Sequence, residues 1–302
     1  MGSGLAHSLS AHRARLVLAF FAIYVLWGST YLAIRVAVET VPPLFAAGVR
    51  FAIAGTILYL WARMRGADGP SGPQWRNLTI LGALMFLCTY SGLFWAEKTV
   101  PSGIASVLVA SVPLWTALLG MFVFKREPPR WSTMGEIVLG LAGVATLALD
   151  PRGGGVNVLA CLVLVASQIA WSLGTALTTT MTLPKSDLIS AGAQMMAGGA
   201  MLLAGSVALG EVPPLPRISP EAAAAIAYLI VAGSLIAFTA YEWLLTQVSA
   251  TKVTSFAYVN PVVALVIGHE LGGEPIGTRT IVGCTLVLAS TIALLRRHEA
   301  PR

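Results

Sequence analysis

A permanent positive charge lies inside an apolar stretch at residues 45–56, which reads FAAGVRFAIAGT. The charge belongs to Arg50, because a guanidinium group stays protonated at every accessible pH. Placing a cation in an apolar medium is costly unless it is paired or hydrogen-bonded. Three roles would justify the residue: tying helices together through several donors, binding a substrate carboxylate, or contacting a lipid headgroup.

Aromatic and small polar side chains recur inside other apolar stretches and could line a binding site. A ring face can hold an apolar group or an ammonium group, and a hydroxyl or amide can hydrogen-bond a solute. The expected substrate-binding residues are Trp27, Ser29, Tyr90, Trp95, Ser111, Trp171, Tyr241, Tyr258 and Asn260. Each has an ordinary alternative, since tryptophan also favours the membrane–water interface and polar residues can bond to freed backbone carbonyls.

Two prolines are the candidate gating kinks. Pro113 and Pro261 lie inside apolar stretches, after SV and VN respectively. A proline within a helix removes one backbone donor and bends the helix. The bends are either static or open and close one end of a cavity.

Signatures of catalysis and of metal binding do not occur in this chain. All four histidines, at positions 7, 12, 269 and 298, lie at the termini or at the end of an apolar stretch, so none can pair with a buried serine. There is no HExxH, no DxxxD pair and no glycine-rich phosphate loop. Cys88, Cys161 and Cys284 are far apart and are typical of small core residues. We therefore expect no enzyme, no cofactor and no metal.

The elements that must position these residues are apolar helices. Of the 302 residues, 56% are hydrophobic and 11% are charged, whereas a soluble domain carries about 25% charged residues. The apolar segments are close to the ~20 residues that cross a bilayer as a helix. Ten spans are predicted, with the fifth extending back to about Trp131: 16–36, 44–62, 78–96, 104–124, 137–149, 156–176, 188–209, 222–245, 253–268 and 281–295.

The chain also repeats itself. AAGVRFAIAGTIL at 46–58 aligns with SAGAQMMAGGAML at 190–202, which sets Gln194 opposite Arg50. The same offset of 144 sets Trp27 on Trp171, and at an offset of 148 the two prolines coincide. The glycine and alanine runs in the aligned segments are typical of close helix packing.

These matches predict an all-α membrane protein with ten transmembrane helices as two inverted five-helix repeats, residues 11–150 and 153–297. Because five is an odd number, the second repeat enters the membrane from the opposite face. Inverted repeats are a transporter architecture, with the substrate near the midplane between the copies. This pattern is the strongest functional signal in the residues themselves.

The net charge of +6 reflects topology rather than nucleic-acid binding. With a cytoplasmic N-terminus and ten spans, thirteen of the nineteen lysines and arginines lie on the cytoplasmic side and five on the other. That bias satisfies the positive-inside rule. Both termini of this multi-pass protein are therefore expected in the cytoplasm, and no nucleic acid is expected as a partner.

Three segments resemble the drug/metabolite transporter superfamily, specifically EamA-type ten-helix exporters: WGSTYLAIRVAVETVPPLFAAGVRF from 27, AEKTVPSGIASVLVASVPLWTALLG from 96, and SFAYVNPVVALVIGHELGGEPI from 255. The likeness extends from about Ala11 to Arg297. It implies a ten-helix carrier of the inner membrane with a central cavity, which exports small metabolites, amino acids or drug-like compounds. The second repeat departs from the usual pattern at GHELGGEP, where His269 and Glu270 precede Glu274.

The expected function is secondary transport by alternating access, and the alternative is a channel or facilitator for a small polar solute. The expected partners are a small-molecule substrate and the lipid bilayer, with protons as the candidate coupling ion. A monomer or weak homodimer is expected, because the duplication makes one chain self-contained.

Arg50 is expected about 9 Å below the outer end of its helix. At that depth it could partly snorkel toward the membrane surface, and it could reach Glu39 or Glu97. Since Gln194 fills the equivalent place in the second repeat, hydrogen bonding rather than charge is the shared requirement. This comparison favours a structural role over capture of a substrate carboxylate.

Overall fold

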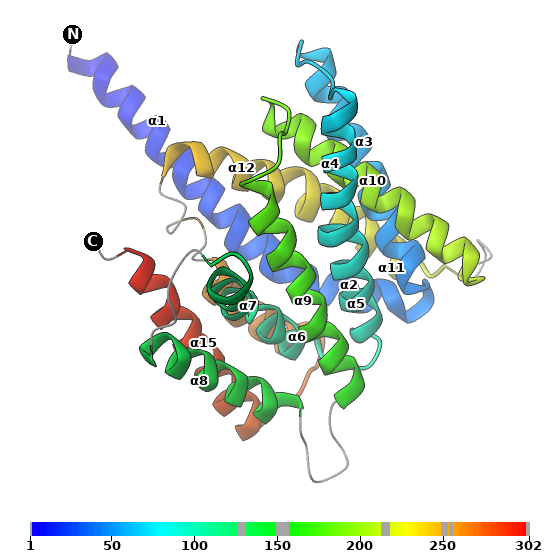
Figure 1. The fold of residues 1–302 in the computed structure, drawn as a ribbon, viewed down its shortest axis with the longest axis vertical. Coiled ribbons are helices and arrows are strands. Elements are labelled where there is room, and N and C mark those ends of the chain that lie inside the picture. The colour runs from blue at the N-terminus through cyan, green and yellow to red at the C-terminus, as the bar shows by residue number, and fades with distance from the viewer. Residues whose placement is uncertain are drawn as a thin grey trace.

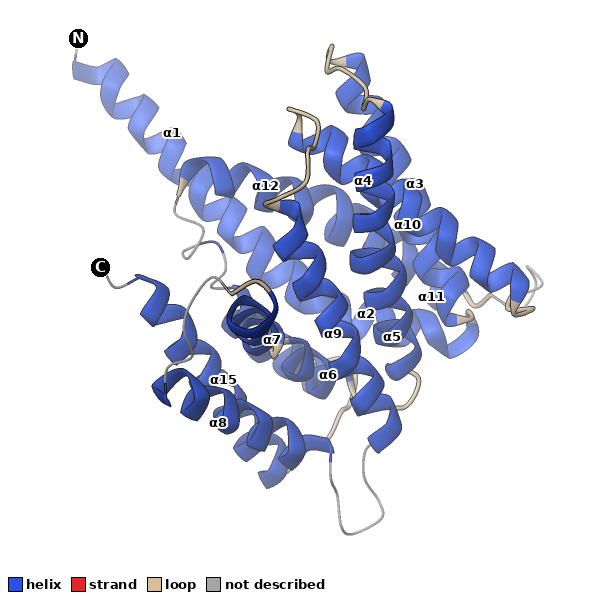
Figure 2. Cartoon of the chain, in the orientation of Figure 1, coloured by secondary structure: helices blue, strands red, loops and turns tan. Residues whose placement is uncertain are grey.

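The structure of the protein is a computed structural model that describes residues 2–125, 131–148, 157–212, 218–248, 253 and 256–299. Within these ranges the chain is helical and contains no strand (Figure 2). Seven helical stretches are long and apolar enough to cross a membrane, and three shorter apolar helices complete the set. The prediction of an all-α membrane protein with ten helices is confirmed.

The first repeat supplies five spans. Several of them are built from consecutive helical pieces, which can be followed in Figure 1. In the described ranges, four short pieces, labelled η, are π-helical. The pieces of the first repeat are α1 (Gly2–Phe21), η1 (Ala22–Leu26) and α2 (Trp27–Thr40); α3 (Pro43–Met64); α4 (Gly72–Gly82), η2 (Ala83–Cys88) and α5 (Thr89–Ala96); α6 (Ser102–Val109), α7 (Val112–Leu118) and η3 (Leu119–Val123); and α8 (Trp131–Ala148).

The second repeat follows the same order. Its pieces are α9 (Val158–Thr178); α10 (Asp187–Ala208); α11 (Pro220–Tyr228), η5 (Leu229–Ile236) and α12 (Ala237–Gln247); α14 (Phe256–Glu270); and α15 (Thr278–Glu299). The third and eighth spans occupy equivalent places in the repeats, and each contains a π-helical segment, η2 and η5. Because π-helical segments are frequent at functional sites, these two spans are good places to look for one.

Local signals explain where several helices begin. The side chain of Asn157 accepts from the backbone N–H of Ala160 at the start of α9. Ser186 and Ser219 cap α10 and α11 in the same way. A side-chain oxygen at this position satisfies one of the N–H groups that a helix start leaves without a partner. Pro43 opens α3, where its missing N–H costs nothing.

Glycines allow α3 and α10, equivalent helices of the two repeats, to cross in close contact. A Cβ atom on Gly55 would lie 2.7 Å from the carbonyl oxygen of Gly192, and one on Gly199 would lie 2.4 Å from the backbone nitrogen of Ala52. The helices α8 and α15 meet similarly through Gly143. Without a hydrophobic driving force inside lipid, such close backbone approach supplies much of the association energy. The predicted packing role of these small residues is confirmed.

Hydrogen bonds between helix ends and loops follow the predicted path of the chain. The backbone N–H of Ser219 donates to the Thr40 hydroxyl at 3.2 Å, and the ten-span prediction puts both residues on one side of the membrane. The Gln74 amide donates to the Leu183 carbonyl at 3.1 Å, and the same prediction puts these residues on the other side. The two repeats are therefore tied to each other near both ends of the helices.

The two predicted kinks differ in form. Pro113 is the second residue of α7, directly after a turn at Ala110–Ser111 that separates α7 from α6. Pro261 lies inside the continuous helix α14. The fourth span is thus interrupted, whereas the described part of the ninth span is not.

Candidate functional site

Arg50 lies inside the protein with 3% of its surface exposed. Its Nε donates to the hydroxyl of Ser234 at 3.1 Å, and its guanidinium carbon lies 4.7 Å from the ring centre of Phe51 and 5.4 Å from that of Tyr90. We call these four residues the Arg50 cluster. The partial snorkelling expected for Arg50 is wrong, because the protein encloses the guanidinium. The cluster joins α3 and α5 of the first repeat to η5 of the second.

The Arg50 cluster retains unused hydrogen-bonding capacity. The Nη1 atom of Arg50 is buried and has no hydrogen-bond partner among the described residues. An unpaired donor of a buried cation is costly. This free donor, walled by aromatic rings, can bind an anionic or carbonyl group of a ligand.

Glu97 is the closer of the two predicted carboxylate partners of Arg50. It interacts electrostatically with Arg50, whereas Glu39 is exposed at the end of α2. Glu97 is the first residue after the third span and is 1% exposed, and neither carboxyl oxygen has a hydrogen-bond partner in the described part of the chain. Burial raises the pKa of its carboxyl well above the usual range, and the carboxylate of Glu274 raises it further, while Arg35 and Arg50 act in the opposite direction.

Trp27 borders the Arg50 cluster from α2. Its indole N–H donates to the carbonyl oxygen of Gly233 at 2.8 Å, and its ring lies 5.3 Å from Tyr241 and 5.1 Å from Phe256. A Cβ atom on Gly233 would lie 3.0 Å from Arg50 Nη2, so the glycine permits this close approach. The structure therefore brings predicted site residues Trp27 and Tyr241 together.

Tyr90 and Trp171 form a second aromatic wall. The ring of Tyr90 lies 4.4 Å from Phe51 and 6.0 Å from Phe86, and Trp171 approaches it edge-on at 6.3 Å. Trp171 belongs to α9, the counterpart of the first span. Tyr90 thus connects Arg50 to Trp171, and Gly233 connects Arg50 to Trp27, the tryptophan that the repeat relates to Trp171.

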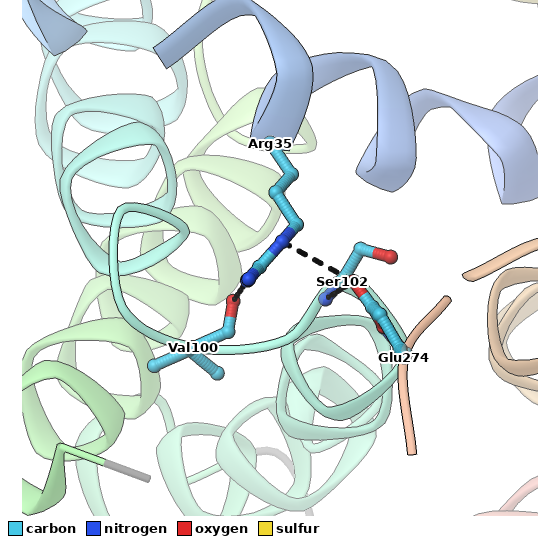
Figure 3. Close-up of polar contacts among 5 residues, drawn as sticks. Arg35, Val100, Ser102 and Glu274 are labelled. Atoms are coloured by element: carbon cyan, nitrogen blue, oxygen red, sulfur yellow. Dashed lines mark hydrogen bonds and ion pairs between the residues drawn. The ribbon is translucent and has the colours of Figure 1, made fainter. Parts of the chain in front are cut away.

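A second polar group crosses between the repeats near the ends of the helices, and we call it the clasp. Figure 3 shows Arg35 reaching the loop before α6 and the carboxylate of Glu274. Arg35 donates to the Val100 carbonyl at 3.0 Å, and its Nε lies 3.5 Å from Glu274 Oε1. The backbone N–H groups of Ser102 and Gly103 donate to Oε1 and Oε2 of Glu274 at 2.7 and 3.0 Å.

The clasp uses the electrostatics of a helix start. The first N–H groups of α6 lack partners within the helix, and the helix dipole favours a negative charge there. Glu274, in the loop between α14 and α15, supplies both the acceptors and the charge. One carboxylate of the second repeat therefore holds the start of a helix in the first.

Asn260 lies next to Pro261 and is 5% exposed. In the amide orientation that satisfies both partners, its nitrogen donates to the carbonyl oxygens of Ile23 and Tyr24 at 3.0 and 3.1 Å. Both carbonyls belong to η1, where the π-helical geometry disturbs the regular ladder. These bonds stabilise the carbonyl groups of η1. Contact between Asn260 and substrate stays a prediction.

The remaining predicted site residues are spread over the molecule. Ser111 is buried and its hydroxyl donates to the Leu108 carbonyl at 2.6 Å. Ser29 bonds to the Tyr228 hydroxyl at 2.6 Å. Tyr258 is partly buried on α14. The structure does not bring these three residues into the Arg50 cluster.

Trp95 lines a separate cavity of about 520 Å³ that also includes Cys88, Ser91, Ser167 and Glu211. The lining comes from α3, α5, α9 and the end of α10, so both repeats contribute. Trp95 itself is 38% exposed. It therefore faces a different space from the Arg50 cluster.

Sequence reasoning missed Ser234, Gly233 and Glu274. Ser234 and Gly233 lie in the apolar stretch LIVAGSLI and gave no signal of their own. Glu274 did give one, since the dipeptide EP occurs at the equivalent place of each repeat, at 127 and 274. Residue 127 lies outside the described residues. Within the described ranges, no three His, Cys, Asp or Glu residues gather in a way that could hold a metal ion.

The sequence pattern of the EamA-like transporter family matches residues 14–149 and, a second time, residues 158–296. The chain belongs to the EamA-like transporter family. This membership agrees with the helical fold and with the two repeats. The superfamily likeness found in the sequence, to the drug/metabolite transporters, is confirmed.

Individual relatives in the EamA family are transporters by name. The chain is 40% identical to the uncharacterized inner membrane transporter YedA of Escherichia coli K12 over 259 residues, which cover 85% of this chain and 82% of YedA. It is 24% identical over 300 residues to the uncharacterized transporter sll0355 of Synechocystis, covering 93% and 90%. A solved crystal structure shares the fold, with a TM-score of 0.64, 19% identity, and coverage of 95% and 99%.

Proposed function

We propose that this EamA protein is a secondary transporter of the inner membrane that exports small metabolites, such as amino acids or drug-like compounds, by alternating access. The observation that carries the proposal is the clasp. It joins Arg35, Val100 and the start of α6 in the first repeat to Glu274 in the second. A contact between repeats at one end of the helices is what a carrier must break and remake when its repeats rock.

The Arg50 cluster and its aromatic border are the proposed substrate contacts. Trp27 and Trp171 come from equivalent helices, and Tyr90 lies between Arg50 and Trp171. An unpaired guanidinium donor next to aromatic faces suits a substrate with an acidic or carbonyl group and an apolar body. Such substrates include amino acids. The lipid bilayer is the other partner, and the protein acts as a monomer or weak homodimer.

The alternative function is that of a channel or facilitator, which would not need a contact between the repeats that breaks and re-forms. Purified protein in liposomes separates the two. The substrate is first found by comparing metabolites in the medium of overexpressing and deletion cells. A carrier then takes up labelled substrate faster when unlabelled substrate is inside the liposome. A pore shows no such stimulation, and that result would replace the carrier by the channel.

We also propose that both termini are cytoplasmic, from the bias of lysine and arginine toward one side. In that orientation the clasp faces away from the cytoplasm. Reporter fusions after Lys125 and at the C-terminus should give the same cytoplasmic signal. Opposite signals from the two fusions would contradict the ten-span inverted arrangement.

A further inference from the structure

Glu97 is a buried acid that the proposed substrate contacts do not use. It lies in the turn between α5 and α6, three residues before the Val100 carbonyl that binds Arg35. The side chain is 1% exposed, and no described residue hydrogen-bonds to either carboxyl oxygen. A carboxylate in such a place is unfavourable unless it takes up a proton or gains a cation.

Charged groups from several elements face Glu97. Its electrostatic neighbours are the two cations Arg35 of α2 and Arg50 of α3, and the carboxylate of Glu274 in the loop before α15. Two phenols complete the surroundings, Tyr31 of α2 and, through Arg50 and Tyr31, Tyr90 of α5. With a proton on Glu97 the four charged or acidic groups sum to +1, and without it they are neutral. Release of the proton from Glu97 therefore removes the excess positive charge of these four groups.

Arg35 is the group that both carboxylates can use. Among the described residues, its side chain donates to the Val100 carbonyl and makes a long contact of 3.5 Å with Glu274, and it is 33% exposed. We propose that Glu97 is a proton-binding site that competes with Glu274 for Arg35, so that release of its proton weakens the clasp. The step is a simple ionisation: the carboxylic acid becomes a carboxylate and the proton leaves to water. No other reactant is needed.

The competition follows from burial. When Glu97 is protonated it is neutral, so Arg35 stays with Glu274 and the clasp is closed, as in this structure. Among the described residues an ionised Glu97 has no side-chain donor, and since the backbone of Arg35 already acts on it, it gains most by drawing the Arg35 guanidinium toward it. Glu274 then loses its cation and retains only the N–H groups of Ser102 and Gly103. Proton release would thus favour opening at this end.

The inference deepens the proposed transport function by giving the proton a binding site, but its test uses no substrate. A cysteine at Ser102, which is fully buried under the clasp, reports opening through its rate of modification by a membrane-impermeant thiol reagent. The exposed native Cys88 is changed to serine in every variant. The rates are measured on purified protein between about pH 5.5 and 8.5, and each is divided by the rate of Glu97→Gln at the same pH. This division cancels the ionisation of the thiol itself.

We expect the wild-type ratio to rise about tenfold across that range. Glu39→Gln, the matched change at an exposed glutamate on the end of α2, should leave the rise intact. Arg35→Gln should abolish it, because the group for which the carboxylates compete is gone. If Glu97→Gln fails to fold, the modification rate of wild type can be divided by that of Arg35→Gln instead, so the test can still be done. The proposal would be overturned if the ratio of the wild-type rate to the Glu97→Gln rate did not change with pH. It would also be overturned if the same ratio rose about tenfold in Arg35→Gln.

Thermal unfolding measures proton binding separately. The pKa of Glu97 is higher in the folded protein than in the unfolded chain, so ionisation destabilises the fold as pH rises above about 4.3, the unfolded value. Glutamine has no such loss. The melting temperature of Glu97→Gln minus that of wild type should therefore increase as the pH is raised. A constant difference over the whole range would show that Glu97 does not exchange a proton there and would also overturn the proposal, while leaving the transport function standing.

Discussion

Replacing Glu274 by glutamine tests how much one carboxylate contributes to the clasp. Its two oxygens accept separate N–H groups of α6 at 2.7 and 3.0 Å. The amide keeps one acceptor and turns its NH₂ toward the other N–H, and a buried donor left without a partner costs about 1–3 kcal/mol. Loss of the negative charge at the helix start removes about 0.3–1 kcal/mol more. The Arg35 contact adds under about 1 kcal/mol, because that side chain is 33% exposed.

Together these contributions come to about 1–5 kcal/mol, and the midpoint of about 3 kcal/mol favours opening by roughly 150-fold. The assay is the modification rate of the Ser102→Cys reporter, measured with and without Glu274→Gln in otherwise identical protein. Glu211→Gln is the control. Glu211 also joins the repeats at a helix start, but through a single bond of 3.2 Å to the N–H of Leu44. The reporter's rate in this control should stay within about threefold of wild type.

An unchanged rate in Glu274→Gln would refute the reasoning, because it would mean that the helix start is held without the carboxylate. An equal increase in both variants would show general loosening of the fold instead of release of the clasp. The amount of folded protein, measured by size-exclusion chromatography in detergent, should be similar in all three proteins.

Three further changes test other parts of the structure. Trp27→Ala and Trp171→Ala should each lower export of the identified metabolite about tenfold while folded protein stays near normal, and loss of folded protein in both would indicate packing instead. Arg50→Gln should selectively lower export of anionic or zwitterionic substrates, because the amide lacks the charge and the unpaired donor of the guanidinium, whereas unchanged export of them would make the arginine structural. Gly199→Leu should abolish folded protein, because its new Cβ would lie 2.4 Å from a backbone nitrogen, while Gly120→Leu, with no atom within 4 Å, should be tolerated.

The helical fold follows from the amino-acid sequence without any knowledge of the structure. A bilayer leaves backbone groups no water to bond with, so an apolar segment of about 20 residues must form a helix. That constraint is local, and it places the spans within about six residues of the observed helix ends, except that α1 begins at Gly2, well before the expected residue 16. The repeat is visible for a similar reason, because Gly55 and Gly199 are needed wherever α3 and α10 touch.

Which polar groups meet depends instead on the packing of the two repeats. Ser234 is an ordinary residue of an apolar helix until the second repeat folds against the first, when its hydroxyl reaches Arg50 from 184 positions away. Glu274 is 172 positions from the N–H of Ser102 that it binds. Glu97 lies close to the end of a span in the sequence, where water would be expected, yet neighbouring helices bury it to 1% exposure. Burial and pairing depend on distances between helices, and no spacing along a single helix contains those distances.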